Sequence, residues 1–283
     1  MLKVMCATDF SHRASEAANK ASKIANLHNG SLMLLHAVNL KFFERLLVGK
    51  RRVDLREDLR AKLASDLESL NAKGAVFAEM GNPSDVILDI ARLENPDLLV
   101  LGDHGEHRLR DSLLGTTARH IVEQATFPIL IVKSDHEVPY KKIVLATDFS
   151  DSSKRSIDLA VKFFPDAHFV LLNSFLAPNR QTAKQYKIDK TEIDNMIAQI
   201  EKEHKEQLEL FKNSLAVVPS KLDLMTIGSS SIVDDILKAC GELEADLLVM
   251  GTKGVGAIVP LTVGSVTDSL VRHSKIDMLI FKA

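Results

Sequence analysis

One glycine pattern occurs twice in the chain and constrains its fold more than any other feature. The first copy runs from Gly102 to Thr116 and the second from Gly251 to Ser265. Each copy reads as glycine, two residues, glycine, nine residues, glycine and a hydroxyl residue, between a short apolar run and a segment of helical period. Glycine lets a backbone approach a ligand closely, and a helix start favours anions. The pattern therefore predicts a phosphate-binding loop between a buried strand and a helix in each half.

The tetrapeptide Thr-Asp-Phe-Ser also occurs twice, at positions 8–11 and 147–150, and follows an apolar run each time. The two aspartates are 148 − 9 = 139 positions apart, whereas the first glycines of the two motifs are 251 − 102 = 149 apart. The second half therefore carries ten additional residues between these landmarks. Two repeats of nearly equal length predict two domains, which we place at residues 1–136 and 137–283.

Apolar runs of strand length alternate with segments of helical period through both halves. This order predicts an α/β fold: two domains, each a five-stranded parallel sheet with helices on both faces. Right-handed crossovers and a strand order of 3-2-1-4-5 would bring the Thr-Asp-Phe-Ser and glycine segments to one sheet edge, where such folds bind ligands. The last strands, 129–132 and 278–281, are wholly apolar, which predicts that the two halves pack as an internal pseudo-dimer.

Composition and motif searches exclude several classes of protein. The formal net charge is −2 and no basic stripe with aromatic residues occurs, so nucleic acid is not an expected partner. We expect no membrane span and no leader, and hence a cytoplasmic protein. Cys6 and Cys240 are expected to be buried hydrophobic residues, and His104 and His107 to be loop residues rather than a metal pair. Neither glycine stretch matches the Walker or dinucleotide-binding pattern.

In these motifs, and over nearly its whole length, the chain resembles a tandem universal stress protein, whose domains are of the adenine nucleotide α-hydrolase-like type. The glycine motif is similar to the ATP-binding signature of one branch of that family. The resemblance implies ATP, with or without Mg²⁺, as the ligand. It also implies these binding residues: Thr8, Asp9, Ala37, Gly102, Gly105, Gly115 and Thr116 in the first half, and Thr147, Asp148, Ser174, Gly251, Gly254, Gly264, Ser265 and Thr267 in the second.

Positions in the family motif suggest how these residues divide the ligand between them. Asp9 and Asp148 would lie near the ribose or base, the residues that end the second strand of each half would face the adenine, and the glycines would hold phosphates. The residues also allow simpler interpretations, in which the two aspartates cap a helix and the glycines only make tight turns.

The leading hypothesis from the sequence is an ATP-binding stress-response or signalling protein with little or no catalysis. No general base, nucleophile or metal-carboxylate cluster is assigned near the glycines, and enzymatic activity, at most slow ATP hydrolysis, stays open. The alternative is a non-nucleotide scaffold or small-ligand-binding tandem domain that acts through a protein partner. A homodimer is compatible with either hypothesis.

The two glycine motifs differ in the chemistry around them. The second spacer, 255–263, is uncharged, Lys253 precedes it and Thr267 adds a hydroxyl, whereas the first half has Ala118 in that place. A lysine and a hydroxyl favour phosphate, whereas carboxylates such as Glu106 and Asp111 in the first spacer disfavour it. We therefore expect the second half to bind ATP more tightly, although Pro260 removes one backbone donor from its spacer.

Overall fold

The computed structural model describes residues 1–39, 52–104, 115–178, 189–252 and 264–281. The chain divides into two compact units, unit 1 (Met1–Pro139) and unit 2 (Tyr140–Ala283). Gly105 and Gly254 of the glycine motifs, and His107, lie outside the described residues. Within the described parts of the chain, no helix is long and apolar enough to cross a membrane.

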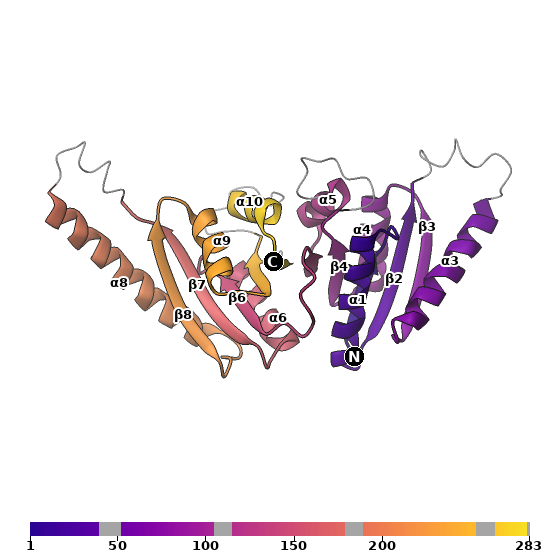
Figure 1. Cartoon of the computed structure of the whole chain (residues 1–283), viewed down its shortest axis with the longest axis horizontal. Helices are drawn as coiled ribbons and strands as arrows, with labels where there is room; N and C mark the ends of the chain where they lie inside the picture. The colour runs from indigo at the N-terminus through magenta and orange to yellow at the C-terminus, as the bar shows by residue number, and fades with distance from the viewer. Residues whose placement is uncertain (40–51, 105–114, 179–188, 253–263, 282–283) are drawn as a thin grey trace. The chain divides into compact units, whose positions relative to one another are not determined.

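Unit 1 is a parallel sheet in which helices connect successive strands along the chain (Figure 1). Every neighbouring pair in the order β3-β2-β1-β4-β5 is parallel. The strands are β1 (Lys3–Ala7), β2 (Ser31–Val38), β3 (Gly74–Met80), β4 (Leu98–Gly102) and β5 (Ile129–Val132). The helices are α1 (His12–Leu27), α3 (Arg52–Ser69), α4 (Pro83–Glu94) and α5 (Thr116–Gln124).

Unit 2 repeats this arrangement, with its parallel strands in the order β8-β7-β6-β9-β10. The predicted α/β fold and strand order are thus confirmed in both units, while their packing as a pseudo-dimer stays a prediction. The strands are β6 (Lys142–Ala146), β7 (His168–Leu176), β8 (Leu222–Ser229), β9 (Leu247–Gly251) and β10 (Asp277–Phe281). The helices are α6 (Asp151–Phe163), α8 (Lys190–Ser214), α9 (Ile232–Glu242) and α10 (Ser265–His273).

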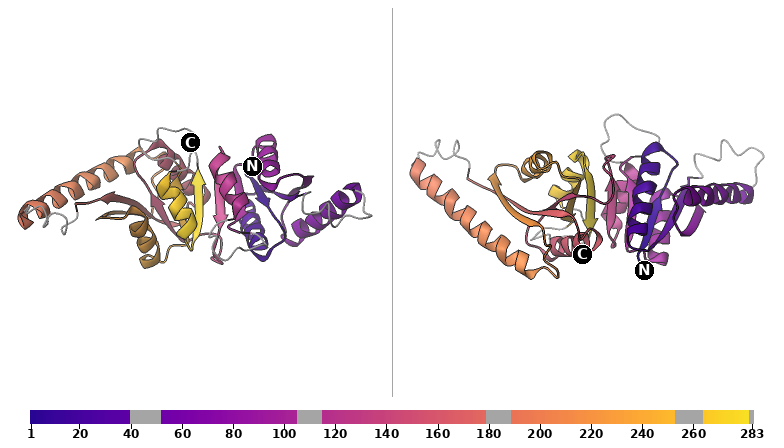
Figure 2. Two further views of the ribbon diagram at one scale, coloured as in Figure 1. Left: turned by 90° about the horizontal axis from the view of Figure 1, so that it is seen from above. Right: turned by 60° about the horizontal axis from the view of Figure 1, so that its bottom comes forward.

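Helices cover both faces of each sheet (Figure 2). In unit 1, α1 packs on β1, β2, β4 and β5, α3 packs on β2 and β3, and α4 packs on β2 and α5. Right-handed crossovers place α1 and α3 on one face and α4 and α5 on the other; α6 and α8, and α9 and α10, correspond to them in unit 2.

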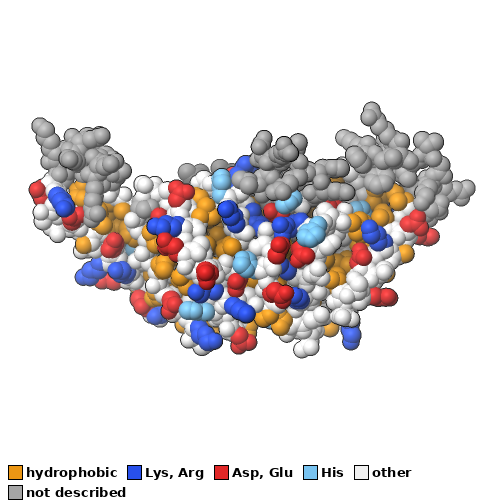
Figure 3. All heavy atoms as spheres, viewed as in Figure 1, with side chains coloured by type: hydrophobic (Ala, Val, Ile, Leu, Met, Phe, Trp, Pro, Cys, Tyr) orange, Lys and Arg blue, Asp and Glu red, His pale blue; other side chains and the backbone are white. Residues whose placement is uncertain are grey.

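Cys6 and Cys240 are buried, and burial raises the pKa of each thiol to about 12. Acidic and basic side chains are intermixed over the described part of the face in Figure 3.

The repeated Thr-Asp-Phe-Ser segment forms the same turn in both units. In unit 2, Thr147 Oγ1 accepts a hydrogen bond from the Phe149 N–H (2.9 Å), and Asp148 Oδ1 accepts one from the Ser150 N–H (3.1 Å). The backbone of Phe149 is left-handed, with φ of 67°, and Ser150 caps α6 by accepting from the Ser153 N–H. Unit 1 has the same bonds and the same left-handed phenylalanine. The serine is therefore the helix cap, and the aspartate holds the turn that leads into it.

The neighbouring strand fixes this turn through a different side chain in each unit. In unit 1, His36 Nδ1 lies 2.7 Å from the carbonyl oxygen of Thr8; a carbonyl can only accept, so Nδ1 donates. Burial lowers the pKa of His36, which favours the neutral ring. In unit 2, Asn173 Nδ2 donates to the Thr147 carbonyl (2.9 Å), and Asn173 Oδ1 lies 2.8 Å from His204 Nδ1 on α8. The turn of unit 2 is thus tied through β7 to the long helix α8.

We expect Asn173→Ala to lower the free energy of unfolding of unit 2 by about 1–3 kcal/mol. The buried Thr147 carbonyl and the His204 ring would both lose their partner. Asn213→Ala, an exposed site on α8, is the matched control and should change stability little. Denaturant unfolding followed by circular dichroism measures the loss, and amide hydrogen exchange in β6 and β7 assigns it to unit 2. Equal stability of the two variants would show that the Asn173 bonds do not hold the turn.

Candidate functional site

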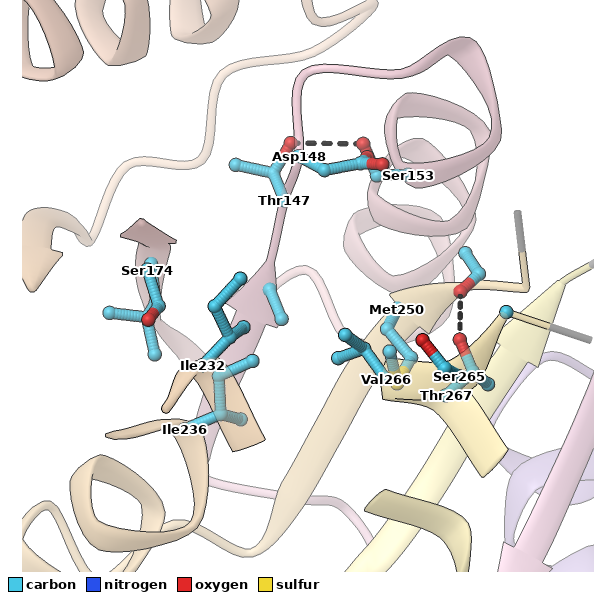
Figure 4. A pocket seen from close by; sticks show the side chains of 14 residues that line it. Thr147, Asp148, Ser153, Ser174, Ile232, Ile236, Met250, Ser265, Val266 and Thr267 are labelled. Atoms are coloured by element: carbon cyan, nitrogen blue, oxygen red, sulfur yellow. Dashed lines mark hydrogen bonds between the residues drawn. The ribbon is translucent and has the colours of Figure 1, made fainter. Parts of the chain in front are cut away.

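A cavity of about 200 Å³ lies at the carboxyl ends of β6, β7 and β9 in unit 2 (Figure 4). This is the sheet edge at which parallel α/β folds bind ligands. Its volume lies below the ~300–1,000 Å³ usual for pockets that enclose drug-sized molecules, so a ligand of that size would be enclosed only in part. The cavity is lined by Ala146, Thr147, Asp148, Ser153, Leu172, Ser174, Ile232, Ile236, Met250, Gly251, Gly264, Ser265, Val266 and Thr267.

Apolar and polar groups occupy different parts of this lining. Ile232 and Ile236 project from α9, with Met250 and Val266 beyond them in the view of Figure 4. Polar groups stand at the edges: Ser174 on β7, the turn after β6, and the start of α10. An apolar wall with a few polar groups around it is the usual design of a small-molecule site.

The start of α10 offers backbone N–H groups to this cavity. Its N-cap is Gly264, which makes no side-chain capping bond, and the first intrahelical bond runs from the Asp268 N–H to the Gly264 carbonyl (2.9 Å). The N–H groups of Ser265, Val266 and Thr267 precede that bond. Every other helix whose N-cap is described starts at a capping Ser, Asn or Asp, except α5, which starts at Gly115. The two open helix starts are thus those that follow the glycine motifs, and an open start favours an anion.

The structure explains differently why the two described positions of the second motif, Gly251 and Gly264, are glycine. A Cβ on Gly251 would lie 2.6 Å from Ser152 Oγ and 2.8 Å from the backbone of Ser152 and Ser153, so glycine lets α6 approach the end of β9. A Cβ on Gly264 would meet Thr252 O at 3.3 Å, and φ of −61° and ψ of 149° suit any residue. Packing therefore requires Gly251, whereas a Cβ at position 264 would need the Thr252 carbonyl to shift by only a few tenths of an ångström.

Three hydroxyl groups in the lining already have partners in the protein. Thr147 Oγ1 and Ser153 Oγ are 2.9 Å apart, and Ser153 Oγ donates to the Ser150 carbonyl, so the Thr147 hydroxyl hydrogen points to Ser153. Thr267 is buried, and its hydroxyl donates to the Gly251 carbonyl (3.1 Å). Thr147 and Thr267 thus line the cavity, but their hydroxyl hydrogens hold the turn and the glycine motif.

Asp148 and Ser174 bring two further polar side chains to the cavity. Asp148 is exposed, and its Oδ1 accepts from both the N–H and the hydroxyl of Ser150 (3.1 and 2.6 Å), which fixes the direction of the carboxylate. Ser174 Oγ donates to Asp235 Oδ2 on α9 at 2.8 Å. One acidic group therefore lies at the turn, and another lies behind Ser174.

Unit 1 places its predicted residues at the corresponding edge with different neighbours. Asp103, which follows Gly102, is buried; its Oδ1 lies 2.6 Å from His104 Nδ1 and 3.5 Å from Arg13 Nε. Its backbone oxygen accepts the Gly115 N–H (2.6 Å). Unit 2 has the neutral Thr252 in this place, and its buried hydroxyl has no hydrogen-bond partner among the described residues. A cavity of about 330 Å³ in unit 1 includes Thr8 but lies between α1 and α3, away from the glycines.

Several residues in the lining or in contact with site residues were not identified from the sequence. Ile232, Asp235 and Ile236 share one face of α9, and a carboxylate among isoleucines at helical spacing was the available signal. Met250 and Val266 directly adjoin predicted residues. Asp103 carried no signal, because only the fold brings Arg13 to it. Among the described residues, no group of three or more His, Cys, Asp or Glu side chains is arranged to hold a metal ion.

Comparison with known proteins identifies what the chain is similar to. The sequence profile of the universal stress protein family matches residues 1–133 and again 139–282. A universal stress protein of Methanocaldococcus jannaschii is 26% identical over 152 residues, which cover 46% of this chain and 94% of the relative. One of Thermus aquaticus is 31% identical over 137 residues, 46% of this chain and 97% of the relative.

A solved structure of similar length extends the comparison to the whole chain. A universal stress protein from Archaeoglobus fulgidus matches 99% of this chain and 98% of its own, with a TM-score of 0.64 and 18% identity. At that level of identity the similarity concerns the fold.

We expect Gly251→Ala to destabilise unit 2 by about 1–3 kcal/mol, the usual cost of an extra methyl group in a packed site. The new Cβ would collide with backbone atoms of α6, which cannot rotate away. Gly102→Ala in unit 1 is the matched control and should cost less, since its Cβ would meet mainly the Arg13 side chain at 3.1 Å. Thermal unfolding of both variants gives the comparison. A Gly251→Ala protein as stable as the parent would contradict the packing argument.

Proposed function

Since the chain belongs to the universal stress protein family, we propose that unit 2 binds an adenine nucleotide, with ATP as its ligand. The protein would act in the cytoplasm in a stress-response or signalling role, with little or no catalysis. The observation that carries this proposal is the open start of α10 at one end of a cavity with apolar walls. A nucleotide combines an anionic end with a flat, largely apolar base, and the two ends of the cavity differ in the same way.

The lining suggests an orientation for the ligand. Phosphates would lie at the N–H groups of Ser265 and Val266, where the helix dipole favours negative charge. The base would lie against Ile232 and Ile236, and the ribose near Asp148. Mg²⁺, where present, would neutralise charge on the phosphates. The β6–β9 pairing holds in fixed register the strands that precede Asp148 and α10.

The described lining favours binding over turnover. Asp148 is the carboxylate of the cavity lining, and its Oδ1 already holds the turn through Ser150. A general base must reach the proton that it abstracts, and Asp148 lies at the turn after β6 while the phosphates would lie at α10. We therefore propose a sensor of bound nucleotide rather than an enzyme.

Unit 2 is proposed to be the tighter site. In unit 1 the first glycine of the motif, Gly102, is followed by a buried carboxylate, Asp103. In unit 2 the corresponding residue is the neutral Thr252. Like charges repel more strongly where water is excluded. Arg13 and His104 offset part of the Asp103 charge but are themselves occupied by it.

Gly264→Asp tests the proposal with little risk to folding. Aspartate is among the best N-cap residues, and the backbone at position 264 accepts it. Its carboxylate would take the open N–H groups and repel phosphate. We expect ATP affinity in unit 2 to fall at least about tenfold, because a hydrogen bond to a charged group is worth ~1.5–3 kcal/mol, while the melting temperature stays the same or rises. Isothermal titration with ATP, ADP and AMP measures the affinity.

Gly115→Asp makes the same change at the start of α5 and is the matched control. It should leave the tighter binding event intact, since its backbone angles, φ of −62° and ψ of 148°, are nearly the same but it lies in unit 1. Loss of the tighter event in Gly115→Asp would reverse the assignment of the units. ATP binding that neither variant affects would refute the helix-start site.

A further inference from the structure

One polar pair at the cavity is not explained by phosphate binding. Ser174 lies at the end of β7 and lines the cavity, and its hydroxyl donates to Asp235 Oδ2 at 2.8 Å. Asp235 stands on the first turns of α9, between Ile232 and Ile236, which line the cavity as well. The carboxylate is thus held behind the serine, on the apolar side of the site.

This bond decides whether Ser174 can donate a hydrogen bond to a ligand or only accept one. A hydroxyl carries one hydrogen and two acceptor lone pairs, and an ionised carboxylate can only accept. Because Ser174 gives its hydrogen to Asp235, its oxygen can only accept a hydrogen bond from a group in the cavity. A serine without such a partner could turn its hydrogen either way.

Unit 1 lacks the pair at the corresponding positions. The Leu35 and Leu172 carbonyls each accept the N–H of the turn threonine, so the two strands align and Ala37 corresponds to Ser174. The N-caps Asn82 and Ser231 align α4 with α9, so that Val86 corresponds to Asp235. Two polar groups in unit 2 thus replace two apolar groups in unit 1, and they are bonded to each other. This favours a selective role over a common folding role.

Ser174 and the start of α10 lie at opposite ends of the cavity (Figure 4). The strand order puts β6 between β7 and β9, and adjacent strands are about 4.8 Å apart, so the two ends are separated by roughly 10 Å. A ligand that contacts both must extend as a nucleotide does from phosphate to base. Ser174 then meets the base edge.

We propose that Ser174, held by Asp235, makes unit 2 selective for a purine that carries a hydrogen-bond donor at position 6, and hence for a 6-aminopurine over a 6-oxopurine. The inference rests on the proposed function. Adenine offers an amino hydrogen to the Ser174 oxygen. The 6-oxo group of hypoxanthine would place an acceptor against an acceptor. A site that hydrogen-bonds one group of its ligand discriminates against an analogue that lacks this group, here from a half-buried serine.

ATP and ITP test this inference, because both carry the same ribose and triphosphate. The binding event to follow is the one that Gly264→Asp weakens at least about tenfold. The parent protein should prefer ATP by about tenfold, the effect of one or two hydrogen bonds. Asp235→Asn should bring the two affinities to within roughly threefold, since an amide can donate to Ser174 and release its hydroxyl hydrogen. Ser174→Ala should weaken ATP several-fold and leave ITP unchanged.

Asp234→Asn is the matched control, as it removes the same charge from the neighbouring, exposed residue of α9. It should retain the preference of the parent protein. Melting curves of all variants check that α9 stays folded. Equal affinity for ATP and ITP in the parent, or an equal ratio in Asp235→Asn and Asp234→Asn, would overturn the inference and leave nucleotide binding standing. If Gly264→Asp weakens no binding event, the proposed function and this inference fail together.

Discussion

Backbone N–H groups that no side chain caps are the feature on which the site depends. A helix start leaves several donors without an intrahelical partner, and α6 and α9 satisfy some of theirs with serine. At α10 the cap is Gly264, whose backbone conformation does not require glycine. The start of α10 therefore adjoins a cavity that Ile232 and Ile236 also line, and the proposed ligand, an anion with an apolar body, would satisfy both surfaces.

The sequence predicted the parts of this arrangement that follow from strand order. Apolar runs fixed which segments are strands, and crossover rules then placed the ends of β6 and β9 at one edge. The prediction that Thr147 and Gly251 converge follows from topology alone, and the cavity lining includes both. Repeated motifs made this robust, because an error in one half would have been visible in the other.

What the sequence did not predict depends on side-chain direction. Asp235 meets Ser174 only because β7 and α9 approach each other, and a helix turn decides which of two adjacent aspartates points inward. Gly251 was expected to cradle a phosphate, whereas its lack of a Cβ also lets the α6 backbone come close. Thr267 was expected to add a free donor, but its hydrogen goes to the Gly251 carbonyl. The motifs predicted where these residues lie, whereas their contacts in the structure show what each side chain does.

The difference between the two units now has a physical basis other than the one that the sequence suggested. Lys253 and the uncharged spacer lie outside the described residues, and the Thr267 hydroxyl is occupied. Within the described residues, a carboxylate follows the first glycine of unit 1, where it engages Arg13 and His104. Two bonded polar groups also stand at the base end of unit 2. With the proposed nucleotide bound, the first difference would disfavour phosphate in unit 1, and the second would favour a particular base in unit 2. Each difference concerns a different end of one extended ligand, and both would make unit 2 the tighter site.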